Sequence, residues 1–137
     1  MSEIGYNTNL AAEFYVMSVL HRLGADAALS LGNKKSVDIA VVRGAGDTIT
    51  IDVKGLAGTT SWPVDNVQTA KQGHFLAFVC FLGKIKEPGT RPETWIVPSS
   101  KLEPLVYNSP NGKRRVVPLG TLRKVGAAFK EDWLSVV

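Results

Sequence analysis

The sequence predicts an α/β fold, and the order of its hydrophobic patterns is the basis of that prediction. A stretch with helical spacing comes first, and three stretches with β-strand patterns follow it. A short helix is then expected before an almost uninterrupted apolar run. With 137 residues, of which 45% are hydrophobic and 20% charged, the chain suits one soluble globular domain over residues 1–137.

The first element is expected to be a helix over residues 8–23. Leu10, Phe14 and Met17 recur at helical spacing and would face the core, and Gly24 would end the helix. Glu13 lies at the border of this apolar face. Its carboxylate either bends out to solvent or has a partner, because burying an unpaired carboxylate costs several kcal/mol.

Three strands are expected next, over residues 25–31, 36–42 and 48–54. The third alternates polar and apolar residues with the period of a β-strand. Asp52 and Lys54 would therefore share one face, while the apolar side chains point into the core. Alone, these two residues indicate no more than a charge pair on a solvated strand face.

The loop Gly44-Ala45-Gly46 between the second and third strands changes that interpretation. A three-residue hairpin loop with glycine in the left-handed conformation is common. If Arg43 lies opposite Asp47, then Asp38 lies directly opposite Asp52. Facing like charges are destabilising, so this arrangement makes sense with a cation between the two carboxylates. A register shifted by one residue would put the aspartates on opposite faces of the sheet.

The middle of the chain is expected to contain a flexible loop, a helix and a buried strand. The loop covers residues 55–62, and Pro63 can start a short helix over residues 64–72. Gln68 and Lys71 would share one face of that helix. Residues 74–82 are apolar almost throughout, which is typical of a strand buried on both faces in the centre of a sheet. His74, at the start of this strand, is expected to be structural.

The last third of the chain is expected to add a strand, a polar segment and a helix. The strand covers residues 94–97, and Ser100 followed by Glu103 has the spacing of a helix capping box. The polar segment over residues 108–118 contains Lys113, Arg114 and Arg115, a run of cations that is usually a solvated loop. Phe129 and Trp133 would lie on one face of a C-terminal helix that docks on the core.

Composition and charge narrow the classes of function. The net charge is +4 and the isoelectric point about 9.3, on the side expected for a polyanion-binding protein, although many basic proteins bind no nucleic acid. Cys80, the only cysteine, is expected to be a buried, inert thiol. The chain shows no signal peptide and no apolar stretch long enough for a membrane span, so a cytoplasmic protein without a membrane partner is expected.

The order of acids and elements resembles the PD-(D/E)XK nuclease superfamily. The residues that support this resemblance are Glu13 in the first helix, Asp38 in the second strand and Asp52-Val53-Lys54 in the third. The sequence is similar to Holliday-junction resolvases and to small bacterial members of the superfamily. The resemblance implies a restriction-endonuclease-like αβββαβ core, with a central mixed sheet flanked by helices. It covers residues 7–82.

The resemblance also implies a metal-dependent nuclease that hydrolyses DNA. Asp38 and Asp52 would hold Mg²⁺ or Mn²⁺ together with the Val53 carbonyl, and Glu13 would bind an outer water or a second ion. Lys54 would position the attacking water, and Gln68 would add a polar group to the catalytic set. The residues expected to grip the DNA backbone are Lys34, Lys35, Lys71, Lys113, Arg114 and Arg115.

Two other functions remain open from the sequence. The chain could be a catalytically silent nucleic-acid-binding or interaction module on the same fold, or a structural α/β domain with an acidic groove. A homodimer is also considered, because Trp62 and Trp95 are expected to be exposed and to offer a contact.

Overall fold

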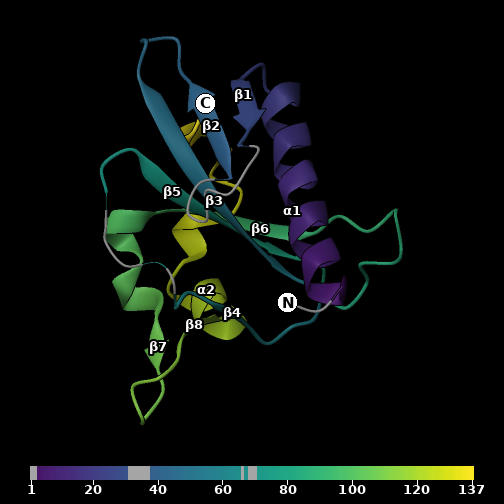
Figure 1. The fold of residues 1–137 in the computed structure, drawn as a ribbon, viewed down its shortest axis with the longest axis vertical. Coiled ribbons are helices and arrows are strands. Elements are labelled where there is room, and N and C mark those ends of the chain that lie inside the picture. The colour runs from purple at the N-terminus through teal and green to yellow at the C-terminus, as the bar shows by residue number, and fades with distance from the viewer. Residues whose placement is uncertain (1–2, 31–37, 66, 68–70) are drawn as a thin grey trace.

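The computed structural model describes residues 3–30, 38–65, 67 and 71–137. Its centre is a five-stranded sheet with the strand order β1-β2-β3-β5-β6 (Figure 1). The strands are β1 (Asp26–Leu29), β2 (Ile39–Val42), β3 (Thr48–Leu56), β5 (His74–Cys80) and β6 (Glu93–Pro98). Neighbours are antiparallel except for β3 and β5, which run parallel, so the sheet is mixed. The predicted α/β class is confirmed.

One helix and a second, smaller sheet cover the two faces of the main sheet. Helix α1 (Glu3–Arg22) packs on β1 and β3 (Figure 1). The small sheet has the order β4-β8-β7, built from β4 (Ser61–Pro63), β8 (Arg115–Pro118) and β7 (Tyr107–Asn108). Helix α2 (Leu119–Lys124) follows β8, and short 3₁₀ turns cover Ser99–Lys101, Glu103–Leu105, Ala127–Phe129 and Trp133–Ser135.

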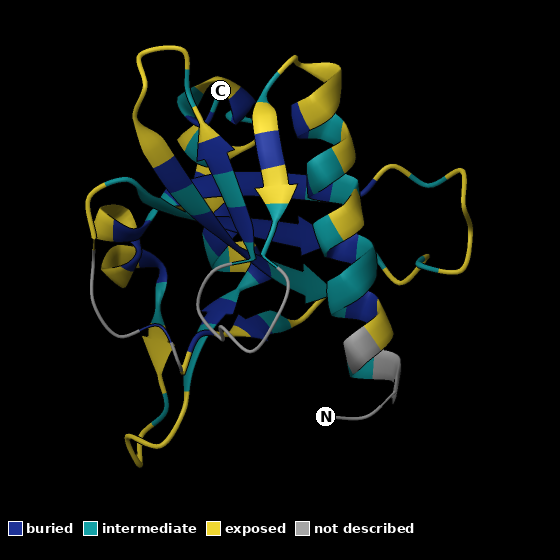
Figure 2. Ribbon diagram, turned by 45° about the horizontal axis from the view of Figure 1, so that its top comes forward, coloured by how far each residue is buried: buried dark blue, intermediate teal, exposed yellow. Residues whose placement is uncertain are grey.

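Alternation along the strands divides the buried side chains into two cores. Figure 2 shows the buried residues along the strands of the main sheet and on one side of α1. The core under α1 receives apolar residues from the helix and from one sheet face, among them Ala12, Val16, Leu20, Ile49, Ile51 and Val53. The core on the other face contains Trp62, which packs edge-on against Phe78 at 5.3 Å and against Trp95 at 6.2 Å between ring centroids. As predicted, the apolar run at β5 is central and contributes to both cores.

Helix α1 differs from its prediction in its start and in its buried face. It begins at Glu3 instead of residue 8, whereas its end before Gly24, which has a φ of 81°, is as expected. The residues facing the sheet are Ala12, Val16 and Leu20, and Phe14 is 56% exposed. Apolar residues occur on more than one side of this helix, so spacing alone does not identify the side that packs.

The segment between β3 and β5 also differs from its prediction. Strand β3 continues to Leu56, and Trp62 lies in strand β4 where a loop was expected. Of residues 64–72, those that the structure describes are in no helix. Both Trp62 and Trp95 are fully buried, so their predicted role as exposed dimer contacts is wrong. Each ring fills the core under the small sheet, where its apolar area is removed from water.

Two predictions near the C-terminus need smaller corrections. Ser100 and Glu103 lie in two successive short 3₁₀ turns, as expected for a helical segment that Pro104 interrupts, but neither turn has the side-chain cap that the spacing predicted. Trp133 is buried as expected, but it and Phe129 belong to separate 3₁₀ turns instead of one helix. In the part of the chain that the structure describes, no helix has the length and apolar character needed to cross a bilayer.

Candidate functional site

The β2–β3 hairpin has the register that brings the two aspartates together. Val42 pairs with Thr48 and Ile39 with Ile51, and the Arg43 N–H donates to the Asp47 carbonyl at 2.8 Å. Gly46 takes the left-handed conformation in the loop, with a φ of 90°. Asp38 directly precedes β2, and this pairing places it beside Asp52. The hairpin predicted from the three-residue loop is therefore confirmed, including its register.

Asp38 and Asp52 interact through their carboxyl groups. The Asp38 Oδ2 accepts a hydrogen bond of 2.7 Å from the Val53 N–H, which fixes the orientation of its carboxylate at the edge of β3. Asp52 is only 5% exposed. Burial is the main cause that raises the pKa of Asp52 to about 7, and the charge of Asp38 and a hydrogen bond with it raise it further. A proton therefore stabilises this pair near neutral pH.

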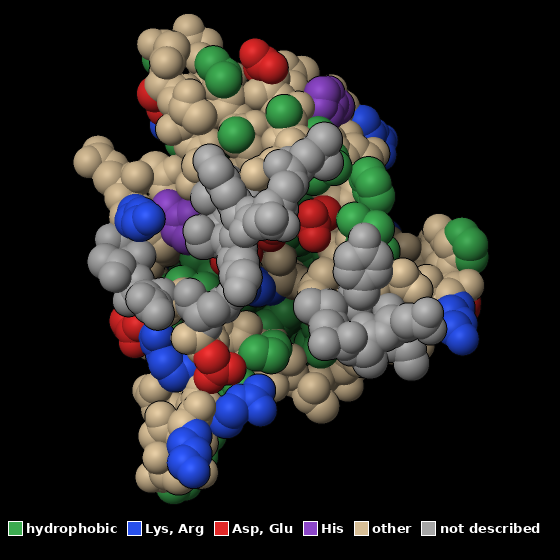
Figure 3. All heavy atoms as spheres, in the orientation of Figure 1, with side chains coloured by type: hydrophobic (Ala, Val, Ile, Leu, Met, Phe, Trp, Pro, Cys, Tyr) green, Lys and Arg blue, Asp and Glu red, His purple; other side chains and the backbone are tan. Residues whose placement is uncertain are grey.

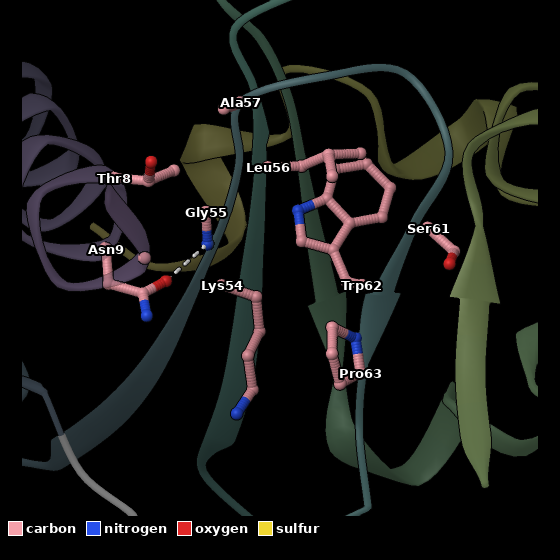
Figure 4. A pocket seen from close by; sticks show the side chains of 10 residues that line it. Thr8, Asn9, Lys54, Gly55, Leu56, Ala57, Ser61, Trp62 and Pro63 are labelled. Atoms are coloured by element: carbon pink, nitrogen blue, oxygen red, sulfur yellow. Dashed lines mark hydrogen bonds between the residues drawn. The ribbon is translucent and has the colours of Figure 1, made fainter. Parts of the chain in front are cut away.

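Lys54 is the cation of this site. Its Nζ lies 3.4 Å from the Asp52 Oδ2, and its attraction lowers the Asp52 pKa against the larger effect of burial. Asp52 and Lys54 are two residues apart in β3, so their side chains share one face of the sheet. The Lys54 ammonium group can therefore reach the Asp52 carboxylate on that face. Figure 4 shows the Lys54 side chain extending away from Gly55. Buried ion pairs of this kind contribute little net stability, since both charges lose water on burial.

Helix α1 approaches β3 closely at Gly55, directly after Lys54. A Cβ atom at Gly55 would lie 2.9 Å from the Thr8 carbonyl oxygen and 3.1 Å from the Ala12 Cβ. The Gly55 N–H instead donates to the Asn9 Oδ1 at 3.3 Å (Figure 4). Only glycine permits this contact. It determines how near the helix comes to β3.

A cavity of about 480 Å³ begins where α1 meets the end of β3 (Figure 4). Its lining combines polar and apolar side chains, among them Thr8, Asn9, Lys54, Ser61 and Pro63. Lys54 thus belongs both to the acidic pair and to this cavity.

Glu13 projects from α1 and is half-buried. Burial raises its pKa, and the negative charge of Asp38 adds to that shift. The two groups are thus near enough to interact. Among the described residues, however, no group of three or more acidic, histidine or cysteine side chains is arranged to hold a metal ion. Among the described residues, the three predicted acids therefore form no such ligand set, although Glu13 and Asp38 interact.

The predicted DNA-binding cations occupy different environments. Lys71 is exposed at the turn before β5, and Lys113 and Arg114 are exposed in the β7–β8 hairpin. Arg114 lies 3.4 Å from Asp65, an exposed pairing of little energetic weight. Arg115 instead pairs with Glu103, and its guanidinium donates to the Val67 carbonyl at 2.9 Å. Arg115 therefore links the small sheet to its neighbours. Lys34, Lys35 and Gln68 lie outside the described residues.

Comparison with known proteins identifies no relative. No family model, no curated protein and no solved structure matches the chain. The site must therefore be interpreted from its own geometry.

Two residues near the site have surroundings that the sequence does not indicate, Asn9 and His74. Asn9 lies inside α1, and its Oδ1 accepts a hydrogen bond from the Gly55 N–H. His74 was expected to be structural, yet its Nδ1 is buried without a hydrogen-bond partner. The positive charges of Lys71 and Lys54 add to burial in lowering its pKa. The sequence offers no signal for the contribution of Lys54, because that residue lies on the neighbouring strand β3.

Proposed function

We propose that this protein is a Mg²⁺-dependent nuclease with a restriction-endonuclease-like core that hydrolyses phosphodiester bonds in DNA. The observation that supports this most is the contact between Asp38 and Asp52 beside the ammonium group of Lys54. Two carboxyl groups held together at the cost of a raised pKa are typical of functional sites. The cavity next to Lys54 offers room for the substrate.

The donor atoms suit a hard divalent cation. Asp38 and Asp52 would hold it, because Mg²⁺ and Mn²⁺ prefer carboxylate and carbonyl oxygens. The Val53 carbonyl is a further oxygen donor, since it follows the N–H that already binds Asp38. Glu13, one helix away, suits contact through a water molecule. When bound, the ion supplies polarisation of the phosphate and a lowered pKa of its water.

The protein's own groups would orient and neutralise the reacting centre. The Val53 N–H holds the Asp38 carboxylate in place. Lys54 would position the attacking water and stabilise the negative charge that develops on the phosphate. Asp52 must lose its proton to bind the cation. With a pKa of about 7 in the free protein, Asp52 makes cation binding stronger as the pH rises through neutrality.

The order of elements also supports this family of folds. An N-terminal helix, a three-stranded antiparallel unit and a strand parallel to β3 agree with an αβββαβ arrangement. The helix expected between β3 and β5 is the element that the described residues lack. The strand pairing therefore supports a restriction-endonuclease-like core, whereas the segment between β3 and β5 adds no support.

A catalytically silent nucleic-acid-binding module is the second candidate. It is favoured by the position of Glu13, which does not join Asp38 and Asp52 in one ligand group among the described residues. In that case the basic surface would bind DNA, and divalent ions would leave the acidic pair unaffected.

Cleavage of DNA with Mg²⁺ or Mn²⁺ tests the proposal. We expect the wild-type protein to nick plasmid DNA and Lys54→Ala to lose at least about a hundredfold in rate, the scale of one charge-stabilising group. Lys86→Ala is the matched control, since this exposed lysine lies in the loop after β5. Circular dichroism would verify that both variants fold. Equal cleavage by wild type and Lys54→Ala would contradict the assigned role.

A further inference from the structure

His74 lies on the same sheet face as the acidic pair. In the parallel pairing of β3 with β5, Thr50 lies opposite His74 and Asp52 opposite Leu76. Residues paired in this way point to the same side of the sheet. The imidazole therefore shares its face with Asp52 and Lys54, although it is distant from both in sequence.

The surroundings of His74 indicate which ring nitrogen carries the proton. Its Nδ1 is buried without a hydrogen-bond partner. A proton on Nδ1 would lack an acceptor, which costs free energy, so the neutral ring keeps its proton on Nε2. Burial and the charges of Lys71 and Lys54 lower its pKa, so the ring is neutral at pH 7. His74 thus offers one N–H donor.

Lys71 is held beside His74 by a tight turn. The His74 N–H donates to the Lys71 carbonyl at 3.3 Å, and Gly73 has a φ of 73°, which is typical of a type II turn. The buried Ser99 hydroxyl binds the Lys71 backbone twice, accepting from its N–H at 3.0 Å and donating to its carbonyl at 3.1 Å. The backbone that presents this lysine is therefore fixed.

We propose that Lys71, His74 and Lys54 form a binding site for a phosphate group of a nucleic-acid backbone, beside the Asp38–Asp52 pair. Two ammonium groups and one neutral N–H donor match the charge and the acceptor oxygens of a phosphate. The inference rests on the proposed function, because it assigns the phosphate to the nucleic acid that the acidic pair would cleave. The site would hold the backbone without reading its sequence.

Nuclear magnetic resonance of the two histidines provides the test. The chain contains only His21 and His74, so each imidazole gives its own signals. His21 lies in the last turn of α1, where its Nε2 contacts the Ala27 carbonyl at 2.9 Å, and it serves as the internal control. In EDTA, which prevents cleavage, we expect inorganic phosphate and a short single-stranded oligonucleotide to shift the His74 signals and leave those of His21 unchanged. Long-range ¹H–¹⁵N spectra should show the Nε2–H tautomer of His74.

Affinity measurements with variants separate binding from packing. We expect His74→Phe to weaken oligonucleotide binding about tenfold, while His74→Gln, whose amide can donate from a similar position, retains it. Lys71→Gln should reduce the salt dependence of binding by about one phosphate contact. Lys86→Gln, in the loop at the opposite end of β5, should have no such effect.

The outcomes distinguish this site from the nuclease itself. Silent His74 signals, equal shifts at His21, or a response to inorganic phosphate but not to the oligonucleotide would overturn the inference, even if the protein cleaves DNA. A His74 response to the oligonucleotide in a protein that cleaves no DNA with any divalent ion would support the phosphate site and contradict the nuclease.

Discussion

At the scale of single residues, the site depends on two aspartates that one hairpin brings together. Asp38 and Asp52 could be paired because a short loop with a left-handed glycine determines the register, and the structure has that register. His74 could not be assigned in the same way. Its neighbours depend on how the distant strand β5 aligns with β3, and no local pattern encodes that alignment.

The raised pKa of Asp52 predicts a specific dependence of stability on pH. Because its folded-state pKa of about 7 exceeds the unfolded value, the folded protein binds the extra proton, and this group makes unfolding harder as the pH falls below 7. From pH 8 to pH 5 we expect the free energy of unfolding of metal-free wild type to gain about 2 to 3 kcal/mol relative to Asp52→Asn. Urea denaturation in EDTA measures this difference.

Asp47→Asn is the control for that experiment. Its hydrogen bond from Arg43 lowers the pKa of Asp47, so this exposed group stabilises the fold above its unfolded pKa and loses that effect only in more acidic solution. Its pH profile between pH 8 and pH 5 should therefore parallel that of wild type. Parallel profiles for Asp52→Asn and wild type would contradict a close carboxyl pair.

At pH 8, Mg²⁺ should raise the melting temperature of wild type and not that of Asp52→Asn.

At the scale of elements, the strands were easier to predict than the helices. The alternation of β3 and the apolar run of β5 each specify their own burial, because a strand has only two faces. Helix α1 offers several apolar sides, and the side that packs is selected by Gly55 and Ala12 at the contact with β3. That choice depends on a close approach in space, which residue spacing does not reveal.

Replacing Gly55 should therefore separate α1 from the site. In Gly55→Ala the new methyl group would meet the Thr8 carbonyl oxygen at 2.9 Å, so the helix must shift away from β3. We expect a loss of about 1 to 3 kcal/mol in the free energy of unfolding, as for other overpacked contacts, together with reduced DNA cleavage. Gly58→Ala is the matched control, because its Cβ would meet nothing within 4 Å. Equal stability of the two variants would show that the contact with α1 is loose.

At the scale of the whole molecule, the basic run of residues 113–115 is visible in the sequence. Which of its side chains are exposed and which are paired within the fold is not. The β7–β8 hairpin projects away from the main sheet, and basic side chains gather on it (Figures 1 and 3). Arg115 is paired at the base, whereas Lys113 and Arg114 are exposed. Burial of Trp62 and Trp95 also removes the surface on which a homodimer was expected, so that assembly has no support from these rings.

We expect Lys113 and Arg114, in the exposed part of the β7–β8 hairpin, to contribute to DNA affinity and not to the rate of cleavage. We expect the double variant Lys113→Gln/Arg114→Gln to weaken DNA binding and to lower the salt slope by up to about two phosphate contacts. The cleavage rate at saturating DNA should stay unchanged, since the hairpin contributes nothing to the acidic pair. Arg115→Gln should instead lower stability by about 1 kcal/mol, because the Val67 carbonyl and Glu103 lose their donor. A lower saturated rate in the double variant would place the hairpin at the reacting centre.

The division of the interior into two cores has a practical consequence for watching this molecule unfold. Trp62 and Trp95 belong to the core beneath the small sheet, and Trp133 belongs to the core beneath α1. Indole fluorescence therefore originates on both sides of β5. Variants that keep the tryptophans of only one core would show whether the two cores unfold as a single cooperative unit or whether one unfolds first.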